Sequence, residues 1–468
     1  MQPVPILSGA WVYCVAISDT FKSSGGAVGT LEKVLDQISG YVWGIPLLVL
    51  LFGTHLFLTF RLGFIQKYTF KAIRMSFTRT KEGEGQISHF GALVTALAAT
   101  IGTGNIVGVA TAVAAGGPGA VLWMWLTGVF GIATKYAEAV LSVKYRTVEK
   151  DGTVSGGPMY VLEKAMKMKW LAVLFAFFTS VAAFGIGNMV QANSIAVMVQ
   201  HNFNISPWIT GSVITAVTAV VIIGGITSIA KVCEYLVPFM AIFYVLGCIV
   251  LLVIRHETIM DTIQLIISSA FTGQAAIGGF AGAGVREAMR FGVARGLFSN
   301  ESGLGSAPIV AAAAQTSHPV KQALISSTGT FWDTVVVCLA TGIVVVNSGM
   351  WQSGLKGAEL TSAAFNDVPY IGNAVLTFGL LTFVFSTILG WSYYGEKAVE
   401  YLFGKKLIMP YRWAWVGAVM VGSVASLQAV WTFADIANGL MALPNLISLI
   451  VLSPVVAAET KDYFSRPQ

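Results

Sequence analysis

Two short polar strings interrupt long apolar stretches of this sequence. The first, Gly-Thr-Gly-Asn at residues 102–105, lies midway between Ser88 and Gly117, and the second, Ser-Asn-Glu-Ser-Gly-Leu-Gly-Ser, fills residues 299–306. A helix in a bilayer loses backbone hydrogen bonds where it unwinds, so irregular backbone survives there only inside protein or around a polar cavity. Both strings therefore indicate a ligand site, with close helix packing by glycine as the structural alternative at 102–105.

The expected chemistry follows from the ends of interrupted helices. Free N–H groups at a half-helix N-terminus attract a carboxylate, whereas free carbonyls at a C-terminal end attract Na⁺ or an ammonium group. An amino acid zwitterion fits both ends at once. Gly102 and Gly104 leave the main chain open to a ligand, and Thr103 and Asn105 add a hydroxyl and an amide oxygen.

An acidic residue, Glu301, lies inside the second string. An ionised carboxylate at bilayer depth is costly unless it is paired, hydrated or protonated. Glu301 is therefore predicted to bind a cation, to exchange a proton or to bond the unwound backbone, and a purely structural partner is the remaining alternative. For two other intramembrane acids, Asp333 and Asp435, structural pairing is the expectation.

Adjacent hydroxyls at Ser386 and Thr387 lie in otherwise apolar surroundings. They can supply the oxygen ligands that hard cations such as Na⁺ prefer. Hydroxyl residues in membrane helices also often bond the carbonyl four residues earlier, which would leave no ion site. Trp391, on the same helical face as Thr387, would cap a pocket or simply pack.

An aromatic residue and two amides share one predicted helical face at Phe184, Asn188 and Gln191. Such a face could line a small polar pocket. Hydrogen bonding between helices by the amides is the alternative.

The composition shows what must position these residues. Of 468 residues, 55% are hydrophobic and 11% are charged, against about 25% charged in soluble domains. The sequence therefore predicts an all-α polytopic membrane protein. Runs long enough to cross a bilayer give eleven spans, at residues 41–60, 89–114, 118–142, 170–199, 207–226, 232–254, 288–313, 322–347, 369–395, 410–428 and 431–457. Residues 263–284 are apolar but rich in Ser, Gly and Ala, which predicts a re-entrant or surface segment.

Basic residues predict the orientation. Lys and Arg cluster between the first and second spans and between the third and fourth, so both loops are expected in the cytoplasm. Residues 1–40 would then form an extracytoplasmic segment, with a cleaved signal left open, and residues 458–468 a cytoplasmic tail of a cell-membrane protein. Three basic residues conflict with this orientation, because they would enter the seventh span from the outside: Arg286, Arg290 and Arg295. Either they line an outer vestibule or the boundary of this span is misplaced.

The order of the spans suggests an internal repeat. The segment 41–60 stands alone, five spans follow in 88–254, and five more in 286–457; an odd number inverts the second set in the membrane. Setting Asn105 against Ser302 aligns the two polar strings. An inverted repeat with paired interrupted helices is typical of secondary transporters whose site lies at the membrane midplane.

Other classes of function find no support in the sequence. Cys14, Cys233, Cys248 and Cys338 have no metal-ligand spacing, and the net charge of +6 is spread beside apolar runs rather than on a nucleic-acid-binding domain. No repeated filter motif suggests a channel, and no nucleophile or metal motif suggests an enzyme. The expected partners are therefore membrane lipid and a transported solute, with no cofactor and no nucleic acid; the oligomeric state stays open.

Six strings together carry a family resemblance. They are GTGN at 102–105, GGPGA at 116–120, ATKYAEAVLSVKYR at 133–146, GGPMY at 156–160, FGIGNMVQ at 184–191 and SNESGLGSAP at 299–308. With them the chain resembles the alanine or glycine:cation symporter family from about residue 40 to 460. The resemblance implies a leucine-transporter-like fold of two inverted five-helix repeats behind one extra helix, and uptake of small neutral amino acids with Na⁺ or, less often, H⁺.

The resemblance also implies roles for single residues. The substrate carboxylate would lie at Thr103 and Gly104, its amino group near Phe298 and Ser299, and the pocket would be shaped by Gln191 and Trp391. The coupling ion would use two sites, one made of Ala98 and Ile101 carbonyls with Ser386 and Thr387, the other of Thr100, Asn105 and Ser299. Glu301 departs from the neutral residue usual in the wider fold, which leaves H⁺ coupling open.

Overall fold

The computed structural model describes residues 27–78, 83–150, 152–272, 284–368, 370–425 and 428–466. Most of them are helical, and η denotes a 3₁₀ helix except at η3 and η5, which are π-helices. The helices, in chain order, are α2 (Ala27–Val42), α3 (Ile45–Arg61), η1 (Ile65–Tyr68), α4 (Thr69–Ser76), α5 (His89–Thr100), η2 (Thr103–Asn105), α6 (Val107–Gly116), α7 (Ala120–Lys144), α8 (Pro158–Lys164), α9 (Lys169–Phe184), η3 (Gly185–Met189), α10 (Val190–Phe203), α11 (Pro207–Ile222), α12 (Gly225–Ile254), η4 (His256–Thr258), α13 (Ile259–Thr272), α14 (Val285–Asn300), α15 (Pro308–Ala311), α16 (Pro319–Thr330), η5 (Phe331–Cys338), α17 (Leu339–Asn347), η6 (Met350–Ser353), α18 (Gly357–Asn366), α19 (Ile371–Phe403), η7 (Lys405–Leu407), α20 (Ile408–Val424), α21 (Gln428–Val451) and α22 (Ser453–Ser465).

Seven helical stretches among the described residues are long and apolar enough to cross a membrane. They are Glu32–Arg61, Lys169–Phe203, Gly225–Ile254, Pro319–Asn347, Ile371–Phe403, Lys405–Val424 and Val430–Val451. The other predicted spans correspond to helices that are interrupted (α5 with α6, α14 with α15), short (α11) or charged (α7). The strongly apolar helices confirm a multi-pass membrane protein.

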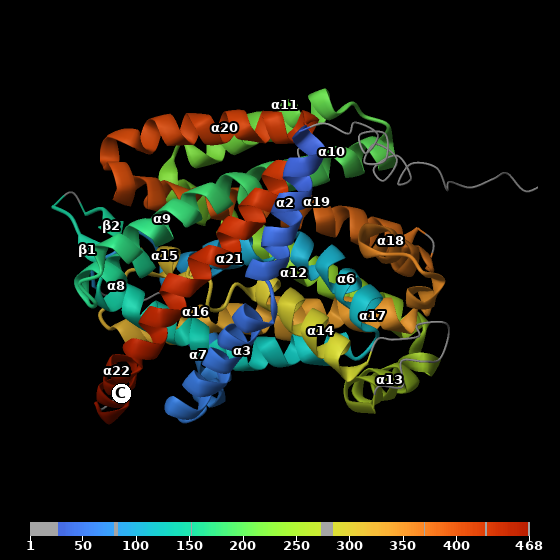
Figure 1. The fold of residues 1–468 in the computed structure, drawn as a ribbon, viewed down its shortest axis with the longest axis horizontal. Coiled ribbons are helices and arrows are strands. Elements are labelled where there is room, and N and C mark those ends of the chain that lie inside the picture. The colour runs from blue at the N-terminus through green and yellow to red at the C-terminus, as the bar shows by residue number, and fades with distance from the viewer. Residues whose placement is uncertain are drawn as a thin grey trace, which may run out of the picture.

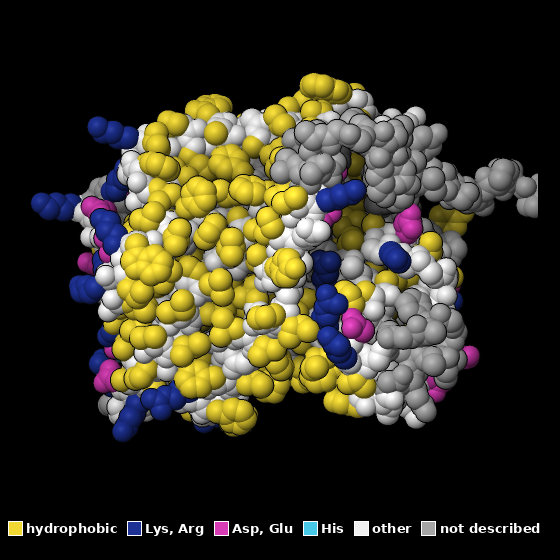
Figure 2. All heavy atoms as spheres, viewed as in Figure 1, with side chains coloured by type: hydrophobic (Ala, Val, Ile, Leu, Met, Phe, Trp, Pro, Cys, Tyr) yellow, Lys and Arg dark blue, Asp and Glu magenta, His cyan; other side chains and the backbone are white. Residues whose placement is uncertain are grey.

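The surface supports the same conclusion. Figure 2 shows a broad hydrophobic belt, with Lys and Arg gathered along the edge where Figure 1 places α22 and the β-hairpin. Many large apolar side chains are exposed on this surface, among them Trp208, Val220 and Phe239. In water such a surface would be unfavourable, whereas lipid tails cover it at no cost.

Local sequence signals fix several helix starts. The Ser88 hydroxyl accepts the N–H of Gly91 at 2.8 Å and so caps α5. Proline stands in the first turn of α11, α16 and α22, where its missing N–H costs nothing. A two-stranded antiparallel hairpin, β1 (Thr147–Val148) and β2 (Val154–Ser155), follows α7 with Thr147 opposite Ser155.

The two interrupted helices lie in the interior of the bundle. Helix α7 packs along α14 and α16, α5 packs against α12, α16 and α19, and α6 packs against α14 and α18. Helix α3, the predicted extra span, packs on α7, while α2 packs along α21 (Figure 1). Interrupted backbone is thus surrounded by protein rather than by lipid.

The first interruption confirms the prediction made for residues 102–105. Helix α5 ends at Thr100, Ile101 and Gly102 are extended, and one 3₁₀ turn leads into α6. The Asn105 Oδ1 atom accepts the N–H of Gly102 at 2.8 Å. A Cβ at Gly102 would lie 2.6 Å from the Thr387 hydroxyl oxygen, so this glycine is needed for close approach of α19.

The second interruption runs from the end of α14 to the start of α15. Glu301 adopts a left-handed conformation with φ of 55°, and Gly303 and Gly305 follow with φ of 91° and 88°. A non-glycine residue in this region is uncommon and strained unless its surroundings hold it. The polar segment 299–306 therefore forms an ordered loop in the interior of the fold, as its polarity predicted.

Two further predictions concern the periphery. Part of the predicted re-entrant or surface segment forms α13, an amphipathic helix whose Ile267 and Phe271 are exposed, whereas residues 273–283 lie outside the described part of the chain. The predicted N-terminal segment is described only from Ala27, where α2 begins.

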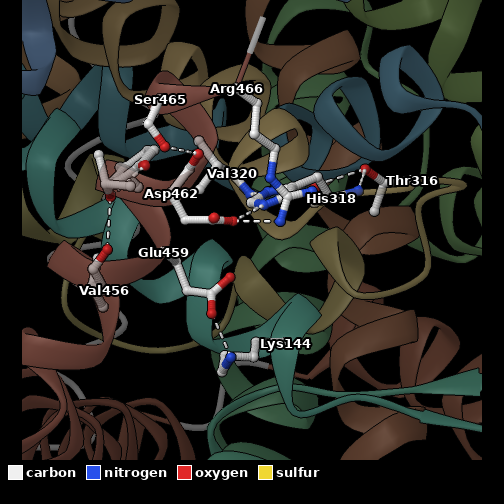
Figure 3. Close-up of polar contacts among 11 residues, drawn as sticks. Lys144, Thr316, His318, Val320, Val456, Glu459, Asp462, Ser465 and Arg466 are labelled. Carbon is white, nitrogen blue, oxygen red and sulfur yellow. Dashed lines mark hydrogen bonds and ion pairs between the residues drawn. The ribbon is translucent and has the colours of Figure 1, made fainter.

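The C-terminal helix α22 is tied to the ends of α7 and α16. Lys144 Nζ donates to Glu459 at 2.5 Å, and Asp462 lies 3.6 Å from His318 Nε2 and 2.6 Å from Arg466, as Figure 3 shows. The hydrogen bond from Arg466, opposed by slight desolvation and aided by His318, holds the pKa of the Asp462 carboxyl below its ordinary value. These contacts close the end of the molecule that carries α22.

Replacing Gly305 with alanine tests whether the second interruption is required for folding. A Cβ there would lie 2.8 Å from Phe175 and from Pro158, at a φ that disfavours side chains. We expect Gly305→Ala to destabilise the fold by roughly 1–3 kcal/mol, seen as a lower thermal midpoint in detergent. Gly417→Ala is the matched control, because a Cβ at Gly417 meets nothing within 4 Å; equal midpoints for both variants would contradict the prediction.

Candidate functional site

A large cavity in the described structure reaches the first interruption and the last turn of α14. It has a volume of about 710 Å³, and four of the residues implied in substrate binding line it: Thr103, Gly104, Gln191 and Phe298. Its wall otherwise comes from α6, α10, α19 and α21, and its outer part includes Asp36 and Ser39 of α2. This volume is in the range of small-molecule sites.

The two interruptions touch at the base of this cavity. A Cβ at Gly104 would lie 3.4 Å from the Ser299 Cα atom and 3.6 Å from the Phe298 ring. Glycine therefore lets the backbone of the first interruption meet the end of α14, and the site between them is narrow. A helix start leaves N–H groups without helical partners and a helix end leaves carbonyls. Here the turn before α6 and the end of α14 lie in contact.

Gln191 lies in the cavity, but the prediction that Phe184 shares its face is wrong. The π-helix η3 inserts a wider turn between them, which rotates the following residues relative to an ordinary α-helix. The Phe184 ring packs on Tyr411 and Trp415, and Asn188 donates to the Trp415 carbonyl at 2.9 Å. The Gln191 amide nitrogen donates to the Ile186 carbonyl at 2.9 Å, which leaves its oxygen without a partner in the described structure.

The residues of the first predicted ion site lie together. Ser386 Oγ donates to the Ala98 carbonyl at 3.2 Å, and Thr387 Oγ1 donates to the Ile101 carbonyl at 3.4 Å. Both hydroxyls also bond the Phe383 carbonyl of their own helix, at 2.8 and 2.9 Å. Thr387 thus makes the bond to the carbonyl four residues earlier that the sequence left as the alternative, and the two hydroxyl and two carbonyl oxygens lie together where α5 ends.

The second predicted ion site has an acidic centre that sequence reasoning assigned to structural pairing. Asp333 accepts from Asn105 Nδ2 at 2.7 Å, from Ser299 Oγ at 3.0 Å and from Thr334 Oγ1 at 2.6 Å. A buried carboxylate between two residues from the two interruptions is well suited to bind Na⁺. Thr100 does not join the cluster through its hydroxyl, which donates to the Ala96 carbonyl at 3.2 Å.

Glu301 is held by two donors rather than exposed in the cavity. The Ser306 hydroxyl donates to its Oε2 at 2.5 Å and the Trp391 indole to its Oε1 at 3.1 Å. Both Glu301 and Trp391 are buried and neither lines the large cavity. The partners of Glu301 are the side chains of Ser306 and Trp391 rather than the unwound backbone, which matches the structural alternative that the sequence left open.

Glu138 and Asn445 are site residues that the sequence analysis missed. Glu138 Oε1 accepts the N–H groups of Gly303 at 3.0 Å and Gly305 at 3.1 Å, and the Asn445 amide donates to the same oxygen at 2.7 Å. The Asn445 amide also donates to the Gly303 carbonyl at 2.9 Å. These bonds replace the helical bonds that the second interruption loses. The sequence signal that could have identified Glu138 is an acidic residue within a predicted membrane span.

The outer part of the cavity carries charge. Arg295 lies one turn before Phe298 on α14 and interacts electrostatically with Asp435 of α21. Asp435 in turn accepts from the Ser39 hydroxyl of α2 at 3.3 Å. Arg295 thus lines the cavity beside an acid, as expected of a vestibule residue, and Asp435 has the structural partner expected of it.

Comparison with known proteins gives a single consistent result. The model of the sodium:alanine symporter family matches residues 28–468. The sodium/alanine symporter AgcS of Methanococcus maripaludis is 53% identical over 442 residues, which cover 92% of this chain and 97% of that protein. A probable sodium/glutamine symporter, GlnT of Bacillus subtilis, is 36% identical over 442 residues, with 92% and 91% covered.

Among solved structures, the chain is similar to the transporter MhsT in complex with L-phenylalanine. The TM-score is 0.55 at 13% identity, with 81% of this chain and 99% of MhsT covered. At that identity the likeness concerns the fold, which is the leucine-transporter fold. The predicted fold class is thereby supported in its general form.

Trp391→Phe tests whether the indole bond to Glu301 stabilises the second interruption. The variant keeps an aromatic ring but leaves a buried carboxylate oxygen without its donor, which should cost roughly 1–3 kcal/mol of folding free energy. The measurement is thermal unfolding in detergent followed by circular dichroism. Trp415→Phe is the control, since Trp415 is also fully buried but its Nε1 has no hydrogen-bond partner in the described structure. A Trp391 variant no less stable than the Trp415 variant would refute the role.

Proposed function

Because the chain belongs to the sodium:alanine symporter family, we propose that it is a secondary active transporter that carries small neutral amino acids, alanine and glycine foremost, together with Na⁺. The observation that carries the proposal is the meeting of two interrupted helices at the base of one cavity. The first supplies N–H groups and the second supplies carbonyls, and both lie beside hydroxyl and carboxylate oxygens.

In this proposal the substrate carboxylate binds at Thr103 and Gly104, where α6 begins. The amino group then points to Phe298 and Ser299 at the end of α14, and the unpartnered Gln191 oxygen can accept one of its protons. The narrow contact between Gly104 and the end of α14 favours a small side chain. Glu301 and Trp391 act on the substrate through the backbone that they hold rather than by contact.

Two sodium sites follow from the same geometry. One uses the Ala98 and Ile101 carbonyls with the Ser386 and Thr387 hydroxyls, whose present bonds to those carbonyls an ion would replace. A second uses Asn105 and Ser299 with Asp333, the acid added by the structure, while Thr100 could contribute only through its backbone. Both sites are built of oxygen ligands, as Na⁺ requires.

The proposed architecture is eleven spans, with two inverted five-helix repeats at 88–254 and 286–457 behind the extra span 41–60. The large cavity includes residues of α2 and of the C-terminal end of α10, which the basic-residue pattern assigns to the outside. The opposite end is closed by α22 and its ion pairs, which belong to the proposed cytoplasmic tail 458–468. On this proposal the described conformation would be an outward-facing state of an alternating-access cycle in the cell membrane, with the 1–40 segment outside.

Proton coupling through Glu301 is the alternative. Both Glu301 oxygens already accept a hydrogen bond, and the residue does not line the cavity, so these contacts favour a structural role. Glu301→Gln discriminates the two mechanisms: loss of a response to an imposed pH gradient, with substrate binding retained, would favour H⁺ coupling.

Uptake of labelled alanine into proteoliposomes tests the main proposal. We expect accumulation when Na⁺ is outside, none above empty liposomes when K⁺ replaces Na⁺ at fixed pH, and competition by alanine and glycine but not by glutamine or phenylalanine. Undiminished uptake in K⁺ would refute sodium coupling, whereas equal competition by glutamine would refute the preference for small side chains.

Thr387→Val tests the first sodium site without changing side-chain size. Loss of one hydroxyl ligand should raise the Na⁺ concentration for half-maximal uptake roughly ten-fold, which corresponds to about 1.4 kcal/mol. Thr382→Val is the control, because the Thr382 hydroxyl bonds only the Phe378 and Gly379 carbonyls of its own helix. If both variants keep the sodium dependence of the unmodified protein, Thr387 is not a ligand.

A further inference from the structure

A buried lysine lies beside both interruptions without a local partner. Lys135, on α7, has 4% of its surface exposed, and its Nζ atom has no hydrogen-bond partner in the described structure. An ammonium group in such a position is costly and is retained in membrane helices where it has a function. Neither the substrate site nor the two sodium sites use this residue.

The lysine faces a small cavity shared by the ends of two half-helices. The cavity, of about 10 Å³, is lined by Lys135, by Thr100 where α5 ends, by Asn300 where α14 ends, and by Ser326. Asn300 Oδ1 accepts the N–H of Ser302 at 2.9 Å, so its amide nitrogen, which has no partner, is free to donate into this space. A space of this size is at the lower limit for one water molecule, which would accept from both nitrogens. Helix C-termini also favour a positive charge.

Three buried acids interact electrostatically with this ammonium group, and one of them, Glu138, lies one turn away on the same helix. Lys135 acts on Glu138, on Glu301 and on Asp333. Glu138 holds the second interruption, Glu301 lies within it, and Asp333 is the centre of the second sodium site. Lys135 thus interacts electrostatically with three acids, and in the described structure it forms no close ion pair with any of them.

We propose that Lys135 is a positioning residue for transport: a tethered cation that competes with Na⁺ for the field of these carboxylates and so keeps sodium binding at Asp333 weak enough for release. The inference rests on the proposed function and adds to it the residue that sets sodium affinity. A site with three acids and no fixed cation would bind Na⁺ tightly and release it slowly. With Lys135 present, an incoming Na⁺ meets repulsion across a poorly screened interior.

The proposal predicts that removing Lys135 and removing Glu138, the two buried charges of α7, shift the half-maximal Na⁺ concentration in opposite directions. Lys135→Met, which keeps the length and packing of the side chain, should lower the Na⁺ concentration for half-maximal alanine uptake roughly ten-fold, the size expected for one unit charge nearby in protein. Its maximal rate should fall because release is slower. Glu138→Gln should raise the half-maximal Na⁺ concentration, and the double variant should return toward the unmodified value.

Glu138→Gln removes the negative charge while it can keep the hydrogen bonds that Glu138 accepts. The Oε1 atom accepts all three hydrogen bonds that Glu138 makes in the described structure, and Oε2 has no partner. A glutamine can therefore keep these bonds. Lys135→Arg is the matched control on the other side, because it retains the positive charge and should retain the sodium dependence.

The experiment measures the sodium dependence of alanine uptake in proteoliposomes at saturating alanine and fixed pH, for the unmodified protein and these variants. A lysine that only packs would change the amount of folded protein but not the half-maximal Na⁺ concentration. If Lys135→Met does not fold, Glu138→Gln decides the matter by the opposite shift. Unchanged sodium affinity in the variants that fold would overturn the inference alone, whereas an unmodified protein indifferent to Na⁺ would overturn the proposed function and this inference together.

Discussion

Satisfying bare backbone inside a membrane fold is the constraint on which the rest of this structure depends. The second interruption leaves the N–H groups of Gly303 and Gly305 without helical partners, and a single carboxylate oxygen of Glu138 accepts both. In hydrocarbon each unsatisfied group would cost several kcal/mol, so the loop depends on the acceptor oxygen that α7 presents at that depth. Asn445 of α21 completes the arrangement by donating to Glu138 and to the Gly303 carbonyl.

Using Glu138 as the acceptor places an ionisable group in the membrane interior, where it is energetically costly, and neighbouring residues compensate for this cost. An acid that accepts backbone hydrogen bonds at this depth is stabilised further by a nearby cation, and Lys135 lies one turn away on the same helix. The extra helix α3 covers this region, since its fully buried His55 is hydrogen bonded to Thr134 at 2.8 Å. The helix that precedes the proposed repeats therefore encloses the polar interior as well as adding a span.

The sequence predicted the parts of this design that are local and missed those that depend on distant partners. Glycine and polar strings within apolar runs indicated both interruptions, because unwound backbone is the main reason for polar residues at that depth, with close helix packing by glycine as the alternative at 102–105. Phe184 was misplaced because a π-helix changes the face on which residues lie, and neither hydropathy nor spacing signals one extra residue per turn. The role of Glu138 depends on contacts with Gly303 and Asn445, which lie 165 and 307 positions later in the chain. The periodicity of α7 gives no indication of such distant partners. Asp333 was recognised as an intramembrane acid, but its link to Asn105 and Ser299 required the packing of three helices.

The two interruptions are held by bonds of different kinds, and this difference bears on how a transport cycle could work. The second is fastened by the N–H groups of Gly303 and Gly305 and by the Asn445 amide, which all donate to one oxygen of Glu138 at 2.7–3.1 Å. The first meets α19 through neutral hydroxyl to carbonyl bonds of 3.2 and 3.4 Å from Ser386 and Thr387. Because the same carbonyls could bind an ion instead, the contact between α5 and α19 can be exchanged at little cost. Ion binding would then change how α5 packs on α19 while α7, α14 and α21 keep their mutual contacts, so coupling requires only the weaker of the two attachments to be remade.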